Sequence, residues 1–319
     1  MSGRTLAEVG EFALIEEFTA GLDQPAAVIL GPGDDAAILR PSGDLVISTD
    51  AMVEDVHFRL RWSGARDVGR KAVASALADV EAMGARVVGL VLALSAPPET
   101  PEDWVREFSQ GVREECGLAG AALLGGDLTR GPVISAVVTV FGDLDGQAAV
   151  CRTGARPGDV VAAVGRFGMA AAGLAVLGRG FRAPGTAVRA HRVPEVPYGQ
   201  GTVARDAGAT SLIDCSDGLL ADLGHVAAAS GVTIDLDSTA FDVDEAQRTV
   251  AAAIGGGDPL TFILTGGEDH ALVGTFGPGT PLPAGWRPLG RVEPVASAPM
   301  VTVDGAAWDA DTPPGWQHF

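Results

Sequence analysis

The sequence predicts an α/β (α+β) fold built from two domains. Three observations point to this class: the chain has 319 residues, apolar strand-like runs alternate with amphipathic helical segments, and a turn-rich stretch divides the chain near its middle. A domain commonly takes about 100–200 residues, so this length gives each of two domains its own core. We place the domains at residues 1–150 and 151–319, because the Gly, Asp and Pro residues of 142–157 mark a boundary.

Strands and helices alternate in the first half, as strand 45–49, helix 67–85, strand 87–94, helix 100–117 and strand 133–141. The first helix is predicted from apolar side chains at helical spacing, and strand 87–94 from the near-continuous apolar character of full burial. Thr100, Pro101 and two acids open the second helix, and Gly117 is expected to end it.

The alternation resumes after the boundary, as strand 160–164, helix 169–177, strand 211–213, helix 216–229 and strands 232–236, 262–264, 272–276 and 289–292. Ser216 is expected to cap the helix that follows it. The proline-bearing residues 179–198 are expected to be irregular. The aromatic residues of the tail at 308–319 predict that this segment is anchored on the rest of the protein.

The charge of the chain restricts its partners. It carries 41 acidic and 22 basic side chains, which gives a formal net charge of −19. This excess argues against binding to nucleic acids or anionic membranes, because both need a basic face. With 47% hydrophobic residues the chain is expected to be globular. The acids therefore either form a solvated surface or include clusters that hold cations.

Composition also restricts how a nucleotide binds and where the protein works. The single lysine, Lys71, does not follow a Gly-x-x-x-x-Gly sequence, so a P-loop is excluded. The cysteines Cys116, Cys151 and Cys215 are spaced too widely for a zinc motif or a disulfide scaffold, which favours the reducing cytoplasm. We expect neither a signal peptide nor a membrane span, since the longest apolar run, 87–96, is too short.

Acidic side chains recur at the ends of apolar segments in five places, which are Gly31-Pro-Gly-Asp-Asp35, Ser48-Thr-Asp50, Asp79, Gly125-Gly-Asp127 and Asp214-Cys-Ser-Asp217. Each place on its own is also consistent with a structural role, such as a polar turn, a strand end, a helix cap or, for Asp79, an ion pair. Together they favour cation binding, because carboxylate and hydroxyl oxygens are the ligands that Mg²⁺ prefers. Acid at a helix start, as at Asp217, repels phosphate unless a metal bridges the two, which suggests a metal-bound nucleotide.

Two of these places make geometric predictions. On a strand, Ser48 and Asp50 share one face and Thr49 lies on the other. Helical spacing puts Asp79 in the middle of the apolar face of its helix. A buried carboxylate without a partner is strongly destabilising. Asp79 therefore needs either a metal ion, which we favour, or a structural partner such as Lys71.

A set of short motifs occurs in a fixed order along the chain, namely Gly10-Glu-Phe-Ala-Leu-Ile15, Gly33-Asp-Asp-Ala-Ala37, Ser48-Thr-Asp50 with His57-Phe58, Leu77-Ala-Asp79 before Ala82-Met-Gly84, Gly125-Gly-Asp127 with Thr129-Arg-Gly131, Asp214-Cys-Ser-Asp-Gly-Leu219, Gly266-Gly-Glu-Asp269 and Trp316-Gln-His-Phe319. The ordered set resembles the thiamine-monophosphate kinase family, whose wider PurM-like superfamily includes AIR synthetase and selenophosphate synthetase. Any one motif is weak, but the set is specific and spans nearly the whole chain. The chain differs from the family pattern at Leu128, at His270-Ala271 and at Gln317.

The resemblance implies a two-domain PurM-like architecture. The N-terminal domain would be a mixed sheet with helices that binds ATP and magnesium and dimerises, and the C-terminal α/β domain would complete the active site. The resemblance also implies a cytoplasmic homodimer that uses ATP as co-substrate and several Mg²⁺ ions.

Residue by residue, the resemblance implies three groups of contacts. The magnesium ligands, direct or through water, would be Asp35, Ser48, Thr49, Asp50, Asp79, Asp127, Asp214 and Asp217. The contacts to ATP would be Gly126, Asp127, Arg152 and Ser216. The contacts to thiamine phosphate would be His57, Glu268 and Trp316. The aspartates are expected to converge on one magnesium site.

The implied reaction transfers the γ-phosphoryl group of ATP directly and in line to thiamine phosphate, which gives ADP and thiamine diphosphate. The acceptor is a phosphate monoester with a second pKa of about 6, so it is mostly ionised at neutral pH. No general base is then required, and no catalytic side chain is assigned. What the reaction requires is neutralisation and alignment of two polyanions, which magnesium ions held by carboxylates supply.

Alternatives stay open from the residues themselves. Trp316 either stacks on the thiamine rings or anchors the tail in a groove, and His57 is either a substrate contact or a surface residue. The other histidines, His191, His225, His270 and His318, are assigned no role. At the level of the whole protein, the alternatives are another PurM-like ATP-dependent enzyme, similar to AIR synthetase or selenophosphate synthetase, and a non-catalytic acidic protein that binds divalent cations.

Overall fold

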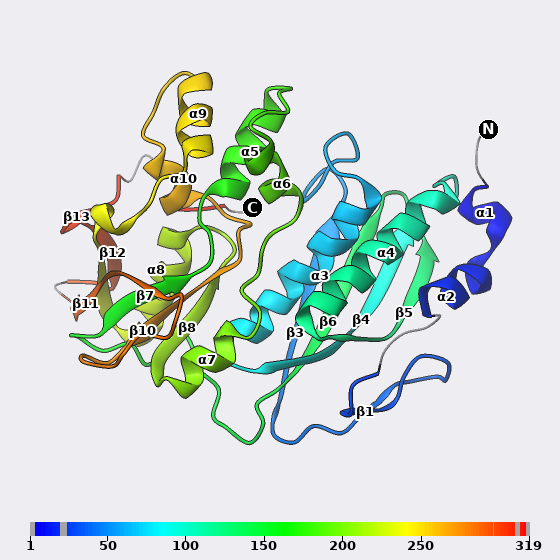
Figure 1. The fold of residues 1–319 in the computed structure, drawn as a ribbon, viewed down its shortest axis with the longest axis horizontal. Coiled ribbons are helices and arrows are strands. Elements are labelled where there is room, and N and C mark those ends of the chain that lie inside the picture. Colours follow the sequence, from blue (N-terminus) through cyan, green and yellow to red (C-terminus); the bar gives the residue numbers. More distant parts are fainter. Residues whose placement is uncertain (1–3, 20–23, 296, 310–312, 317–319) are drawn as a thin grey trace. The chain divides into compact units, whose positions relative to one another are not determined.

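The fold is described from a computed structural model, which covers residues 4–19, 24–295, 297–309 and 313–316. The chain divides into two compact units. Unit 1 comprises Met1–Val80 and Ala85–Gln147, and unit 2 comprises Glu81–Gly84 and Ala148–Phe319. Each unit contains a β-sheet with helices packed on it (Figure 1), so the predicted α/β class is confirmed.

The elements of the first part of the chain follow the order α1 (Leu6–Val9), α2 (Glu11–Thr19), β1 (Val28–Leu30), β2 (Ile38–Leu39), β3 (Leu45–Val53), α3 (Ala65–Ala82), β4 (Arg86–Ala96), α4 (Glu102–Ala119), β5 (Ala122–Arg130) and β6 (Ser135–Asp143). β1 and β2 pair as a small hairpin. The other four strands form a mixed sheet in the order β3-β6-β4-β5, in which only β4 and β5 are parallel. Helices α3 and α4 lie side by side over one face of this sheet (Figure 1).

Three predicted boundaries in unit 1 are wrong. Strand 45–49 continues to Val53, because all of β3 pairs with β6, and Asp50 therefore lies in mid-strand. The helix predicted at 67–85 runs from Ala65 to Ala82. Helix α4 continues past Gly117 and ends at Gly120, whose φ of 69° is the left-handed conformation that glycine adopts at helix ends.

Unit 2 contains β7 (Val160–Val164), α5 (Met169–Gly178), α6 (Gly185–Arg192), α7 (Gln200–Asp206), β8 (Ala209–Cys215), α8 (Leu219–Ser230), β9 (Val232–Leu236), the 3-10 turn η1 (Ser238–Ala240), α9 (Glu245–Ala253), α10 (Leu260–Thr265), β10 (Ala271–Phe276), β11 (Arg287–Pro294), β12 (Met300–Val303) and β13 (Ala306–Ala307). Its sheet has the order β13-β12-β9-β11-β7-β10-β8. The strands pair antiparallel except for β12 with β9.

The sheet of unit 2 has an apolar core on each face. In one core, Ile213 and Ile234 of the sheet are buried together with Leu223 of α8. The other core, on the opposite face, includes Leu212, Leu272 and Phe276. This explains why β7, β8 and β10 are apolar at successive positions rather than alternating. Among the residues described, no helix has the length and the apolar composition that a membrane span requires.

Two predictions in unit 2 are wrong. Residues 262–264 lie in helix α10, not in a strand, because a short apolar run does not distinguish a buried helical turn from a buried strand. Residues 179–198 are not wholly irregular, since Gly185–Arg192 forms α6 after Pro184.

A buried carboxylate fixes one edge of unit 1. Asp143, at the end of β6, accepts the Ser42 N–H and hydroxyl at 2.7 Å each and the Gly43 N–H at 2.9 Å. Arg86 Nη2 lies 3.2 Å from the same carboxylate, whose side chain is 1% exposed. Burial by itself raises the pKa of Asp143, but the hydrogen bonds outweigh it and lower the pKa from 3.8 to about 2. The ionised carboxylate therefore stabilises the fold.

Replacement of Asp143 by asparagine is expected to lower the free energy of unfolding by about 2 kcal/mol at pH 7, the energy equivalent of the depressed pKa. Because the folded pKa lies below the unfolded one, this stabilisation is complete above about pH 4 and is lost as the pH falls toward 2. Urea unfolding at several pH values measures both effects. Asp103→Asn, at a side chain that is 73% exposed, is the matched control. Equal acid sensitivity of wild type and Asp143→Asn would contradict the assignment.

Candidate functional site

Two predicted ligands meet inside unit 1. The Ser48 hydroxyl on β3 donates to Asp79 Oδ2 on α3 at 2.5 Å. Asp79 is half-buried rather than buried, because it faces β3, which is an edge strand of the sheet. Lys71, the structural partner considered for Asp79, donates to the main-chain oxygen of His57 at 3.1 Å. A hydroxyl and a carboxylate so placed offer two hard oxygen donors to one cation.

The alternation predicted for Ser48, Thr49 and Asp50 is confirmed. Burial alternates along β3, with Ser48 and Asp50 half-buried on the helix-covered face and Thr49 exposed on the other. The Thr49 hydroxyl lies 3.0 Å from that of Thr139, its partner on β6. Asp50 Oδ1 accepts the N–H of Ala51 at 2.8 Å. Asp50 therefore lies on the same face as the Ser48–Asp79 pair.

Asp127 and Asp35 lie apart from that pair. Asp127 on β5 is opposite Ala93 on β4, which places both on the exposed face of the sheet. β5 and β3 are the two edge strands, so the strands that carry Asp127 and Thr49 are three strand spacings, about 14 Å, apart. Asp35 lies exposed in the loop of the β1–β2 hairpin. Unit 1 therefore brings together Ser48, Asp50 and Asp79 on one face, and not all six predicted ligands.

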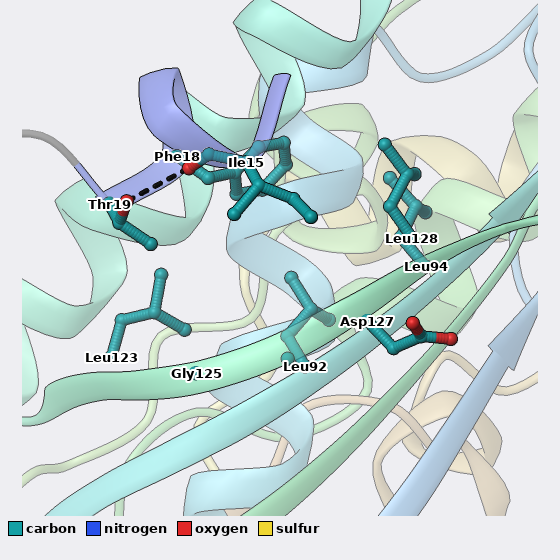
Figure 2. Close-up of a pocket in the computed structure, with 10 residues that line it drawn as sticks. Ile15, Phe18, Thr19, Leu92, Leu94, Leu123, Gly125, Asp127 and Leu128 are labelled. Atoms are coloured by element: carbon teal, nitrogen blue, oxygen red, sulfur yellow. Dashed lines mark hydrogen bonds between the residues drawn. The ribbon is translucent and has the colours of Figure 1, made fainter. Parts of the chain in front are cut away.

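An apolar pocket adjoins the Gly-Gly-Asp motif. Its lining residues are Ile15, Phe18, Thr19, Leu92, Leu94, Leu123, Gly125, Gly126, Asp127 and Leu128. Figure 2 shows Ile15 and Phe18 of α2 opposite the leucines of the strands, with the Asp127 carboxylate apart from them. Leu128, one of the departures from the family pattern, is part of this apolar lining. The lining suits an apolar group rather than a charged one.

Gly126 also needs to be glycine because the main chain of Leu92 lies too close for a side chain. A Cβ at this position would overlap the carbonyl oxygen of Leu92, its partner on β4. The residue thus allows β4 and β5 to pair, besides leaving the main chain open on its exposed side. From the sequence, Gly126 was expected only to let a ligand approach the main chain closely.

His57 has a defined tautomer. The N–H of Val53 donates to His57 Nδ1 at 3.0 Å, so this nitrogen carries no proton and the neutral ring carries its proton on Nε2. The side chain is half-buried. His57 can therefore act as a hydrogen-bond donor through Nε2.

In unit 2, one loop carries Asp214, Ser216 and Asp217 between β8 and α8. The prediction that Ser216 caps α8 is wrong. The helix begins after Gly218, and the carboxylate of Asp222 holds the preceding turn. Asp222 Oδ2 accepts the N–H of Gly218 at 2.9 Å and that of Asp217 at 3.1 Å. Burial, reinforced by Asp214 and Asp217, raises the pKa of Asp222 to about 7. Asp222 was not predicted from the sequence, although a carboxylate in a first helical turn is a known signal for such a cap.

The Gly-Gly-Glu-Asp loop is attached to this same segment. Glu268 donates its N–H to the Ser216 carbonyl at 2.8 Å, and a Cβ on Gly267 would overlap that carbonyl. Glu268 has a φ of 67°, a left-handed conformation that non-glycine residues rarely adopt. Such strain is commonly found where a side chain must be held for binding.

Asp269 attaches the Gly-Gly-Glu-Asp loop to the start of α5. Its side chain is 1% exposed, accepts the Ala170 N–H at 3.2 Å and lies 3.5 Å from Arg166 Nε. Burial raises the pKa of Asp269 to about 6, against the opposing effects of Arg166 and the main-chain N–H groups. Asp269 therefore supports the loop that carries Glu268, a role that was not assigned from the sequence.

Two histidines that were assigned no role contact predicted site residues. His191 Nδ1 on α6 lies 3.2 Å from Glu268 Oε2, and His270 Nδ1 lies 3.1 Å from Asp214 Oδ2. No spacing rule could find them, because each meets a partner from a distant part of the sequence. His318, Gln317 and Phe319 lie outside the described residues.

The tail is anchored at this site, as predicted for this segment. Trp316 donates its N–H to the Asp217 carbonyl at 2.9 Å, and its residue is 57% exposed. The ring is therefore available to solvent while its main chain is fixed. Arg152 is exposed, and its carbonyl accepts the Ser230 hydroxyl at 3.2 Å. Unit 2 thus gathers Asp214, Ser216, Asp217, Glu268 and Trp316 around one loop.

The predicted magnesium ligands are divided between the units. Unit 1 holds Asp35, Ser48, Thr49, Asp50, Asp79 and Asp127, and unit 2 holds Asp214 and Asp217. Within the part of the chain that the structure describes, no three His, Cys, Asp or Glu side chains form a metal-binding group on their own. Convergence of all these aspartates on one site stays a prediction.

Comparison with known proteins gives consistent matches. The family model "AIR synthase related protein, N-terminal domain" matches residues 33–144. A curated relative, the thiamine-monophosphate kinase of Mycobacterium tuberculosis (strain CDC 1551 / Oshkosh), is 49% identical over 318 residues, which cover 99% of this chain and 93% of the relative.

Solved structures agree with that match. The crystal structure of thiamine-monophosphate kinase from Stenotrophomonas maltophilia K279a has a TM-score of 0.78 and 33% identity, and the match covers 92% of this chain and 95% of the other. A structure described as "AaThiL complexed with AMPPCP and TMP" has a TM-score of 0.78 and 29% identity over 100% of both chains.

Proposed function

The chain belongs to the thiamine-monophosphate kinase family, and from this premise we propose that it transfers the γ-phosphoryl group of ATP directly and in line to the phosphate of thiamine phosphate. The products are ADP and thiamine diphosphate. The observation that carries the proposal is the unit 2 site, in which the Asp214–Asp217 loop is hydrogen-bonded to Glu268 on one side and to Trp316 on the other. The residues expected to bind the metal-bound nucleotide and the residues expected to bind thiamine phosphate are thereby joined by main-chain hydrogen bonds.

Magnesium is proposed from the chemistry of the donors. Ser48, Asp79 and Asp50 supply hydroxyl and carboxylate oxygens from one face of unit 1, a set that fits a hard divalent cation. The proposed ligands of unit 2 are Asp214 and Asp217, and Asp35, Thr49 and Asp127 complete the set proposed for unit 1. Bound Mg²⁺ would neutralise the phosphates of the two substrates, which explains why a site for anions is rich in acid.

The side chains have separate tasks in the proposed reaction. The acceptor phosphate is mostly ionised at neutral pH, so no residue is required to remove a proton from it. Ser216, Gly126 and Arg152 would contact ATP, with Arg152 supplying fixed positive charge. The apolar pocket beside Gly126 and Asp127 has a lining suited to the flat base of a nucleotide. The AMPPCP in the matched complex is an ATP analogue, which supports ATP as the co-substrate.

Thiamine phosphate is proposed to contact three residues. The exposed Trp316 ring offers a face to the thiazolium cation, an attraction of about 0.5–2 kcal/mol. Glu268, whose main chain is fixed, would pair with the ring system. His57 would donate from Nε2, since its Nδ1 already accepts a main-chain N–H.

A direct assay tests the proposal. Purified protein with ATP, MgCl₂ and thiamine phosphate should form ADP and thiamine diphosphate in equal amounts, and thiamine in place of thiamine phosphate should not be turned over. Omission of Mg²⁺ should stop the reaction. Binding of nucleotide without formation of thiamine diphosphate would indicate another ATP-dependent reaction and would exclude the proposed substrate.

We also propose that the protein is a cytoplasmic homodimer. Its three cysteines are free thiols, as the reducing cytoplasm favours. The face of the unit 1 sheet opposite α3 and α4 exposes Leu45 at 41%, Ile47 at 60% and Val137 at 38%. These residues lie on neighbouring strands, and an apolar sheet face of this kind suits a twofold contact with a second copy.

Ile47→Glu is expected to convert the dimer to a monomer, because it places a charge in the centre of this face. Leu118→Glu, at a residue on α4 that is 62% exposed, is the matched control and should stay dimeric. Sedimentation velocity measures the mass of each variant. If wild type sediments as a monomer at micromolar concentration, the dimer is excluded.

A further inference from the structure

His270 joins the two motif segments of unit 2. It follows Asp269 and immediately precedes β10, whose antiparallel pairing with β8 places Ala271 opposite Cys215 and Leu272 opposite Asp214. His270 Nδ1 lies 3.1 Å from Asp214 Oδ2, and the two side chains are 9% and 5% exposed. The contact is therefore a buried hydrogen bond between residues that are 56 positions apart in sequence.

The backbone holds the histidine in place. The N–H of His270 donates to the Cys215 carbonyl at 2.9 Å, directly beside Asp214. His270 has a φ of 53°, a left-handed conformation that persists in a non-glycine residue only when its surroundings impose it. The main chain thus holds His270 directly beside Asp214.

We propose that His270 is a positioning residue for Asp214. An ionised carboxylate only accepts hydrogen bonds, so the ring donates from Nδ1 and fixes one of the two Asp214 oxygens. Rotation of the carboxylate is then restricted, and the second oxygen is kept for the cation that accompanies ATP. The inference rests on the proposed role of Asp214 as a magnesium ligand. Groups that orient metal ligands in this way commonly change metal affinity by about 10- to 100-fold.

The test compares two substitutions that separate the hydrogen bond from the shape of the ring. His270→Phe keeps a ring and removes the donor. His270→Asn keeps a donor near the position of Nδ1, and asparagine also accepts a positive φ readily. We expect the free Mg²⁺ concentration for half-maximal turnover to rise about 10- to 100-fold in His270→Phe and to stay near the wild-type value in His270→Asn. Thermal unfolding without Mg²⁺ confirms that each variant is folded.

The outcomes are distinguishable. An unchanged Mg²⁺ requirement in folded His270→Phe would overturn the inference. Equal losses of kcat in both variants, without any shift in the Mg²⁺ requirement, would also overturn it, because they indicate a purely structural role. If His270→Phe does not fold, His270→Ala takes its place in the comparison with His270→Asn. Failure of the proposed function appears separately, as the absence of thiamine diphosphate with the wild-type protein. In that event, calorimetric titration of Mg²⁺ with AMPPCP still measures whether wild type and His270→Asn bind the cation more tightly than His270→Phe.

Discussion

Replacement of Asp50 by asparagine is expected to abolish turnover while the protein stays folded. Asparagine has nearly the same shape but no charge, so it weakens binding of a divalent cation and the neutralisation of the substrate phosphates. The side chain is half-buried in mid-strand on the helix-covered face of β3, with Ser48 on the same face. We expect kcat to fall by more than about 10²-fold, the scale of losing one preorganised electrostatic contact at a reacting group.

The control for this variant is Asp44→Asn. Asp44 is an exposed aspartate just before β3, so the change removes the same charge from unit 1 without touching the proposed ligands. It should keep nearly wild-type kcat. Steady-state kinetics with excess Mg²⁺ and circular dichroism of both variants decide the matter. Near-normal turnover in Asp50→Asn would remove this residue from the proposed magnesium site.

Replacement of Gly267 by alanine is expected to damage both stability and activity. The added Cβ would overlap the Ser216 carbonyl and approach the Asp217 carbonyl to 3.1 Å, so the loop must move away. Overpacking of this kind destabilises proteins by about 1–3 kcal/mol. It also breaks the hydrogen bond that fixes Glu268 to Ser216. Because a misplacement of about 1 Å in a positioning group can lower the rate by about 10²-fold, we expect a loss of that order in kcat/KM.

Gly224→Ala provides the contrast. Gly224 lies inside α8 of the same unit, and a Cβ there would meet nothing within 4 Å. Alanine in a helix interior is favoured over glycine by up to about 1 kcal/mol, so this variant should be slightly more stable and fully active. Urea unfolding and steady-state kinetics of the two alanine variants test the assignment, which fails if Gly267→Ala behaves like Gly224→Ala.

Features that depend on local periodicity were predictable from the sequence. The strands that flank the boundary, the face shared by Ser48 and Asp50, and the helix that carries Asp79 follow from spacings of two and of 3.6 residues. Residues 262–264 were assigned to the wrong element because three apolar residues contain too little of either period.

Features that depend on partners distant in sequence were not predictable in this way. The Ser48–Asp79 hydrogen bond requires the packing of α3 on β3. Asp222 was missed because Ser216, a good capping residue by type, lies nearer to the predicted start of α8, whereas the fold uses the later carboxylate. His191 and His270 meet Glu268 and Asp214 only after the strands and helices of unit 2 are assembled.

The antiparallel pairing of β8 with β10 has an evolutionary consequence. It makes residues 214–218 and 266–270 physical neighbours, joined by main-chain hydrogen bonds and by the His270–Asp214 contact. A change in one segment alters the space and the donors available to the other, so the two are expected to covary among related sequences. Chimeric enzymes designed to exchange substrate preference should therefore transplant both segments together, since a single exchanged loop would meet a partner shaped for a different sequence.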